Sequence, residues 1–320
     1  MMGRVPAEIS WKGRFIKVPA VNVDGLTVII QGKWVKIANV KDEIWLPGDV
    51  VGDPETIVAR LKREKSGADL FHFYQKTPGV EPRYKFPFDR HNVAAIPITS
   101  FADWWGELSR QSKQNIKRSE REGVVVRQVP LDDELIAGIV KINNESPVRQ
   151  GRRFWHYGKS FEAVKKDYSD LLDHSEFLGA YYQGELIGLM RLMCLGDFAS
   201  VLQLLCLHAY CDKRPASLLI SKAVEHCAEK GAKYLVYGQY VYGDNTDSTL
   251  TEFKRRAGFK RFDIPSYWVP LTLKGRLAKA LNVHESFKNI VPRWVLDFAR
   301  SMRSRISRKR EQAVPAADSA

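Results

Sequence analysis

Residues 201–207 read Val-Leu-Gln-Leu-Leu-Cys-Leu, and residues 212–217 read Asp-Lys-Arg-Pro-Ala-Ser. The first stretch is an apolar run of strand length, and the second is a short basic turn. A helix is predicted after the turn, because apolar residues recur at helical spacing at Ala216, Leu219, Ile220, Ala223, Val224 and Cys227. Free backbone N–H groups and the positive end of the helix dipole meet at such a turn. The pattern therefore predicts a phosphate-binding site.

The chain beyond this helix continues the alternation of strand and helix. Residues 234–237 predict a strand, residues 248–257 a second helix, and the pair Gly258-Phe259 precedes a last strand that ends near Trp268-Val269. In the N-terminal part, strands are predicted at 14–18, 26–30, 34–38, 69–74 and 93–98, with a helix at 53–64. Alternating strands and helices predict an α/β (α+β) fold.

The order of elements over residues 176–271 resembles the central and C-terminal motifs of the GNAT acyltransferase superfamily. In that superfamily the turn before the helix reads Arg/Gln-x-x-Gly-x-Gly/Ala, and its amides hold the pyrophosphate of coenzyme A. The resemblance assigns donor binding to the turn of this chain, through Lys213, Arg214, Ala216 and Ser217. The turn has no glycine and Pro215 lacks an N–H donor, so it departs from a tight pyrophosphate cradle.

A second departure lies at residues 253–259, which read Phe-Lys-Arg-Arg-Ala-Gly-Phe. The usual GNAT helix ends Leu-Tyr-x-x-x-Gly-Phe, and Lys254 stands where the tyrosine would be. This ending looks like the FemAB-like branch, whose members contain two GNAT-like domains and move an amino acid from aminoacyl-tRNA onto a cell-wall precursor. The resemblance implies that Lys254 steadies charge at the reacting carbonyl, and a cation there would stabilise the transition state. A solvated lysine beside Arg255 and Arg256 is the alternative interpretation.

A polar helix is predicted at residues 108–123, and it is similar to one that FemAB-like proteins carry. The matching residues are Leu108, Ile116, Arg121, Gly123 and Val124. Basic residues share one face of this helix, at Arg110, Lys113, Lys117 and Arg121. Such a stripe can grip phosphates, or it can be a solvated surface.

The resemblance predicts two tandem GNAT-like domains with a mixed central sheet flanked by helices. We expect a degenerate N-terminal domain at 1–125, an acyltransferase domain at 126–273, and a basic helical tail with a disordered end at 274–320.

Residues 143–157 predict a polar loop rich in basic and aromatic side chains. In GNAT proteins the loop between the first two helices faces the acceptor, so we expect acceptor binding by Arg149, Arg152, Arg153, Trp155 and Tyr157. Such residues can bind an anionic, ring-bearing acceptor, or a tRNA end by stacking. Alternatively, the aromatic rings are core and the arginines solvated. Tyr240 follows a strand where a cleft would open, and it either relays a proton or packs in the core.

Charge is concentrated at the C-terminus. The chain of 320 residues carries a formal net charge of +13, and residues 274–310 hold eleven Lys or Arg against two acidic residues. The apolar residues Val291, Trp294, Val295, Phe298, Met302 and Ile306 fall on one helical face. A basic amphipathic helix of this kind predicts docking on an anionic membrane surface. A helix docked on the protein itself, or nucleic-acid binding, would give the same pattern.

No apolar run approaches the ~20 residues needed to span a bilayer, and no metal-ligand spacing is present. We expect a cytoplasmic enzyme, peripheral at the inner face of the membrane where the tail docks. The expected donor is acetyl-CoA, another acyl-CoA or aminoacyl-tRNA, with no metal. The expected acceptor is an amine on a lipid-linked or glycan envelope precursor. The alternatives are an ordinary acetyl-CoA-dependent N-acetyltransferase and a non-enzymatic protein that binds nucleic acid or membrane on a GNAT scaffold.

Overall fold

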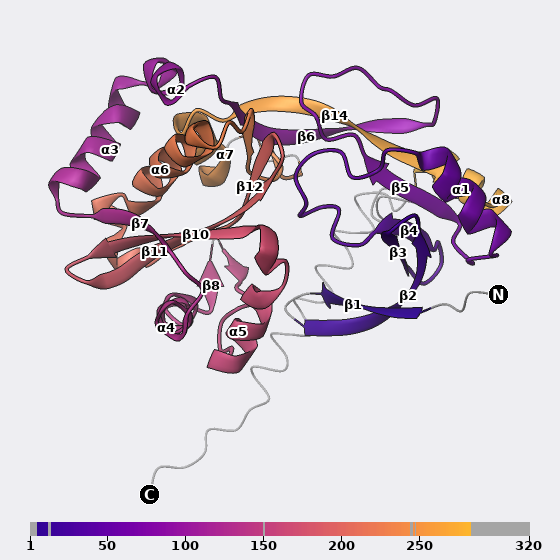
Figure 1. Cartoon of the computed structure of the whole chain (residues 1–320), viewed down its shortest axis with the longest axis horizontal. Helices are drawn as coiled ribbons and strands as arrows, with labels where there is room; N and C mark the ends of the chain where they lie inside the picture. Colours follow the sequence, from indigo (N-terminus) through magenta and orange to yellow (C-terminus); the bar gives the residue numbers. More distant parts are fainter. Residues whose placement is uncertain (1–4, 12–13, 150, 244–245, 247, 283–320) are drawn as a thin grey trace, which may run out of the picture.

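A single twelve-stranded sheet runs through the protein, with helices on its faces (Figure 1). The computed structural model describes residues 5–11, 14–149, 151–243, 246 and 248–282. The strand order is β1-β2-β3-β4-β5-β14-β6-β13-β12-β11-β10-β7, and a separate pair, β8-β9, lies outside it. Most neighbouring strands are antiparallel, but β4 with β5 and β12 with β13 are parallel. The predicted mixed sheet with flanking helices is confirmed.

The strands before residue 125 are β1 (Val5–Trp11), β2 (Arg14–Val23), β3 (Leu26–Gln31), β4 (Ile37–Val40), β5 (Leu70–Tyr74) and β6 (Phe88–Pro97). Those that follow are β7 (Val125–Val129), β8 (Val148–Arg149), β9 (Arg152–Arg153), β10 (Ser175–Tyr182), β11 (Glu185–Leu195), β12 (Phe198–Cys206), β13 (Tyr234–Val236) and β14 (Lys260–Pro270).

The α-helices are α1 (Pro54–Arg63), α2 (Phe101–Glu107), α3 (Arg110–Arg121), α4 (Asp133–Asn143), α5 (Phe161–Ser169), α6 (Pro215–Glu229), α7 (Thr249–Arg256) and α8 (Leu273–Ala280). Two short 3-10 helices are η1 (Leu172–His174) and η2 (His208–Lys213). In Figure 1, α2, α3, α6 and α7 lie over one face of the C-terminal half of the sheet, and α4 and α5 lie over the other.

The two halves of the chain interlock through β14. This strand lies between β5 and β6, so the last strand in the sequence pairs on both sides with strands of the N-terminal part (Figure 1). Tyr267 and Val269 of β14 are buried in the core with α1, whereas Phe259, just before β14, is buried in the core with α6. The boundary expected at residue 125 stays a prediction, since the sheet is continuous across it.

The tail expected at 274–320 begins within α8, whose Ala278 packs on Leu70 and Trp268. Residues 283–320 of the expected tail lie outside the described residues, and so does the predicted apolar face at 291–306. Within the described part of the chain, no helix has the length and apolar character that crossing a membrane requires.

Candidate functional site

The N-terminus of α6 is built differently from the other helix starts that the structure describes. Each of the other α-helices begins at an Asp, Ser or Thr whose side chain accepts a hydrogen bond from a first-turn backbone N–H. The residue before α6 is Arg214, and it makes no such bond. Its backbone is left-handed, with φ of 57°, a conformation that costs a non-glycine residue roughly 1–2 kcal/mol. The turn therefore leaves helix N–H groups without a side-chain acceptor.

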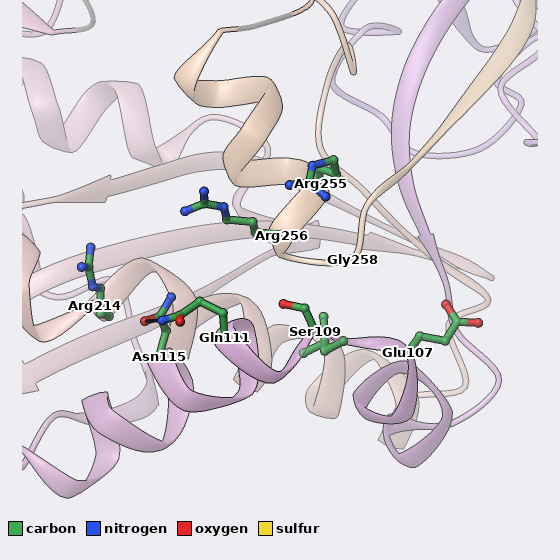
Figure 2. A pocket seen from close by; sticks show the side chains of 9 residues that line it. Glu107, Ser109, Gln111, Asn115, Arg214, Arg255, Arg256 and Gly258 are labelled. Atoms are coloured by element: carbon green, nitrogen blue, oxygen red, sulfur yellow. Dashed lines mark hydrogen bonds between the residues drawn. The ribbon is translucent and has the colours of Figure 1, made fainter.

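Arg214 opens onto three adjoining cavities that we call the Arg214 groove. The largest, about 660 Å³, is lined by Arg214, by Arg255, Arg256 and Gly258 at the end of α7, and by residues 107–115. Figure 2 shows Arg214 and Arg256 extending into the space between α7 and the Gln111 and Asn115 side chains of α3. The second and third cavities, each about 380 Å³, extend the groove toward Ser217 and along α3.

The groove is strongly basic. Among the described residues, six cationic side chains line it, Lys117, Arg118, Arg121, Arg214, Arg255 and Arg256, against the two carboxylates Glu107 and Glu252. Glu252 pairs with both Arg255 and Arg256, and their hydrogen bonds lower its pKa to about 2. Lys117 and Arg121 belong to the predicted basic stripe and face the groove, whereas Lys113 of that stripe donates to the Gly106 carbonyl. Such a groove can hold a polyanion.

The other predicted donor-binding residues lie at the same turn. Ser217 lines the groove, and Ala216 is half-buried in the first turn of α6. Lys213 points elsewhere: its Nζ atom lies 4.3 Å from the centre of the Tyr182 ring and 3.9 Å from a carboxylate oxygen of Glu122. The structure thus brings Arg214, Ala216 and Ser217 together and directs the charge of Lys213 away from them.

The Gly-Phe pair after α7 helps to fix the side of the groove that the end of α7 forms. Gly258 has φ of +86°, and a Cβ atom there would lie 2.7 Å from Nε1 of Trp104. That indole donates to the Ala257 carbonyl at 3.2 Å, and the Ser112 hydroxyl donates to the Arg256 carbonyl at 2.7 Å. The last turn of α7 is therefore held by α2 and α3, which explains why only glycine fits at 258.

Lys254 is fully buried beneath the segment that follows β13. Its Nζ atom donates to the carbonyl oxygens of Tyr237 at 2.7 Å and Gln239 at 2.5 Å, and lies over the Tyr237 and Tyr242 rings. Burial lowers its pKa to about 8. Two of the three N–H bonds of the Lys254 ammonium are therefore hydrogen-bonded to these carbonyls. The alternative of a solvated lysine is wrong, because none of its surface is exposed.

The two parallel strands above Lys254 separate. β12 and β13 pair only at 198–200 with 234–236, and beyond this point the chain follows β6 through hydrogen bonds between Ala94 and both Tyr237 and Gly238. β12 continues to Cys206 beside β11 alone. Tyr240 is half-buried against the core, and its carbonyl accepts from the Thr251 hydroxyl. Its proposed proton relay stays a prediction.

The loop at 149–157 presents only part of its predicted binding surface. Arg149 donates to the carbonyls of Cys206 at 3.1 Å and Ile142 at 2.6 Å, which anchors the loop to the end of β12. Trp155 and Tyr157 are exposed, and Arg153 lies 5.6 Å from the Trp155 ring centre. Arg152 lies in β9. Acceptor binding by this loop stays a prediction. In it, Arg149 would hold the loop in place through the Cys206 and Ile142 carbonyls.

Several groove residues were not in the predicted donor site. Arg255 and Arg256 appeared only as neighbours of Lys254, and Gln111 and Asn115 lie between the residues of the basic stripe. A sequence signal was available, because the Gly-Phe pair marks the end of α7 and Arg255 and Arg256 stand in its last turn. Among the described residues, no three His, Cys, Asp or Glu side chains gather as metal ligands would.

In overall fold the chain is similar to solved structures that include FemX, so its fold is GNAT-like. The structure of FemX superposes with a TM-score of 0.56 at 11% identity, over 87% of this chain and 90% of that one. The C-terminal domain of a putative lysylphosphatidylglycerol synthetase from Agrobacterium fabrum gives 0.55 at 16% identity, over 82% and 86%. L-PGS from Bacillus licheniformis gives 0.51 at 15% identity, over 76% and 80%. No protein-family model and no curated protein matches the sequence.

Proposed function

We propose that this protein is an acyltransferase that takes an aminoacyl group from aminoacyl-tRNA and transfers it to an amine of an envelope or glycan precursor. The observation that carries the proposal is the Arg214 groove at the uncapped start of α6. A helix N-terminus with free N–H groups and surrounding arginines favours a phosphate-bearing carrier. The names of the similar structures, FemX and lysylphosphatidylglycerol synthetase, agree with this class of reaction.

The groove favours a long polyanion over a single pyrophosphate. Pro215 removes one N–H from the turn, and the left-handed Arg214 replaces the glycines of the usual cradle. The remaining cations continue along α3 through Lys117, Arg118 and Arg121. A tRNA acceptor end carries a phosphate at every nucleotide, so it would contact cations along the whole groove. An acyl-CoA donor, as in an ordinary N-acetyltransferase, would use only the part next to Arg214 and Ser217.

Lys254 would act through its buried positive charge and not by direct proton transfer. Its ammonium holds the Tyr237 and Gln239 carbonyls and places a positive charge where β12 and β13 separate. A buried cation at this place would stabilise negative charge that develops on an acyl carbonyl oxygen. The protein would otherwise contribute positioning of the amine and the acyl carbon.

Donor binding tests the proposal directly. We expect a stable amide analogue of aminoacyl-tRNA to bind more tightly than coenzyme A in calorimetric titrations, with a strong dependence on salt. Tight binding of acetyl-CoA without tRNA binding would favour the ordinary N-acetyltransferase. Binding of neither would contradict the proposed function.

Membrane association is a second candidate role, favoured by α8. Leu273, Leu277 and Leu281, spaced by four residues, are all at least 64% exposed, and Lys274 and Arg276 are exposed beside them. An apolar stripe with flanking cations suits the boundary of an anionic bilayer. This role would place the enzyme at a lipid-linked acceptor, and retention on anionic vesicles tests it.

A further inference from the structure

A separate apolar cavity lies where β12 and β13 part, and we call it the Trp45 cavity. Its volume is about 420 Å³, within the range of small-molecule sites. The apolar wall includes Trp45, Val93, Phe198, Leu202 and Ile264. These residues come from both halves of the chain, and none of them lines the Arg214 groove.

The mouth of the Trp45 cavity is also apolar. Ile44 and Trp45 line the cavity and are 66% and 50% exposed. They belong to a loop that is firmly held: Lys76 Nζ donates to the Leu46 carbonyl at 2.6 Å and to the Glu43 carbonyl, and Tyr74 N–H donates to the Glu43 carboxylate at 2.8 Å. The cavity is thus preformed, and exposed apolar rings at its entrance favour a ligand with an apolar chain.

One end of the cavity is polar. His91 and Gln239 line it, with the His91 Nε2 atom 3.3 Å from the Gln239 side-chain nitrogen. Burial and the nearby Lys76 lower the pKa of His91, so its ring is uncharged at neutral pH. The Gln239 amide nitrogen donates to His91 Nε2, which leaves the imidazole Nδ1–H as a donor and the Gln239 amide oxygen as an acceptor. Lys76 also lines the cavity, so this end suits a neutral group that both donates and accepts hydrogen bonds, such as a hydroxyl or an uncharged amine.

Gln239 connects the cavity with Lys254. Its side chain meets His91 in the cavity, and its backbone carbonyl accepts from Lys254 Nζ at 2.5 Å. Gln239 therefore contacts both the polar end of the cavity and Lys254, the buried cation that the proposed function assigns to the acyl carbonyl oxygen.

We propose that the Trp45 cavity binds the acyl acceptor, a molecule with an apolar chain whose terminal amine or hydroxyl group lies at His91 and Gln239. The acceptor assignment rests on the proposed function; the binding site itself does not. In the transfer, the acceptor nitrogen forms a bond to the acyl carbon and the ester bond to the carrier breaks. The amine loses one proton and the carrier hydroxyl gains one.

The experiment uses the full chain and n-alkyl probes. Calorimetry should show affinity for n-alcohols rising about four-fold for each methylene from hexanol to nonanol, because each added CH₂ is buried. Octanol should bind more tightly than 1-methoxyoctane, which has no hydrogen to donate. His91→Phe should weaken octanol binding about ten-fold and leave the binding of the tRNA analogue unchanged.

A filled cavity provides the decisive variant. Ser200 lines the cavity and is half-buried, so Ser200→Trp should abolish octanol binding while binding of the tRNA analogue and cooperative unfolding persist. Equal octanol binding in Ser200→Trp would overturn the site. Octanol binding without any donor binding would support the site and contradict the proposed function.

A transfer assay tests the acceptor assignment separately from binding. With labelled aminoacyl-tRNA, the wild type should form the labelled octylamide, and Ser200→Trp should not. Octylamine that binds but receives no label while the donor is hydrolysed would overturn the acceptor assignment.

Discussion

The Nζ atom of Lys254 lies 2.7 Å from the carbonyl oxygen of Tyr237, in a place that solvent does not reach. A lysine in this position carries a charge that has lost its water and gained two carbonyl oxygens. The contact joins α7 to the segment after β13, and both the stability and the proposed chemistry of the protein depend on it.

The pH dependence of stability should reveal this lysine. Its pKa is about 8 in the folded protein against an ordinary value of 10.5. Between these values the unfolded chain holds a proton that the folded chain lacks, so raising the pH from 8 to 10.5 favours folding. Relative to Lys254→Met, the free energy of unfolding of the wild type should rise by roughly 3 kcal/mol over this window. Urea titrations at both pH values measure the difference, and parallel pH curves would contradict the prediction.

Lys254→Met should also reduce aminoacyl transfer by about 100-fold or more, because an electrostatic stabiliser of the transition state is lost. Binding of the tRNA analogue should stay within about two-fold, since Lys254 does not line the Arg214 groove. Single-turnover kinetics separate the two effects. Unchanged turnover in a folded variant would remove Lys254 from the mechanism.

Arg214→Gly should separate stability from function. Glycine adopts φ of 57° without strain, so the variant should be more stable by about 1 kcal/mol. Its donor affinity should nevertheless fall by about ten-fold or more, because a charge-assisted contact to phosphate is lost. Arg261→Ala is the control: Arg261 pairs with Asp263 on β14, outside the groove. Equal loss of affinity in both variants would point to a general charge effect.

The glycine after α7 should be far less replaceable than the one after α6. Gly258 and Gly231 both have positive φ, but a Cβ atom at 231 meets nothing within 4 Å, whereas at 258 it meets the Trp104 indole. We expect Gly231→Ala to cost about 1 kcal/mol, and Gly258→Ala to cost a further 1–3 kcal/mol. Chemical denaturation measures both, and similar losses would mean that Trp104 moves aside without penalty.

The exposed stripe on α8 should matter only at a membrane. Leu277→Glu should reduce co-sedimentation with vesicles rich in phosphatidylglycerol and leave stability within about 0.5 kcal/mol, because Leu277 is exposed. Leu195→Glu, at another exposed leucine, is the matched control. Retention that is unaffected by Leu277→Glu would exclude α8 from membrane contact.

Local sequence patterns predicted much of this fold. The apolar stripe from Ala216 to Cys227 predicted α6, and a helix was predicted at 53–64 where α1 forms, because caps and helical periodicity act over a few residues. The position of β14 between β5 and β6 was not predictable from such patterns. Strand pairing of this kind joins residues that lie about 190 positions apart, and no local propensity encodes the partner.

The candidate site was predicted only in part, because its local segments can be read from the sequence but its long-range contacts cannot. The basic turn at Arg214 is contiguous in sequence, so it could be found from composition and spacing. Arg149 resembled a binding residue, but its two terminal nitrogens donate to the Cys206 and Ile142 carbonyls, which only the folded chain shows. The Trp45 cavity gathers residues from six separate segments, none of which carries a signature on its own.

The place of β14 has a consequence for biosynthesis. Until Pro270 has left the ribosome, β5 and β6 each keep an unpaired edge, so the nascent chain has no complete N-terminal unit to form early. Completion of the sheet must wait until β14 has been translated, and the exposed edges make the unfinished polypeptide a natural client for chaperones.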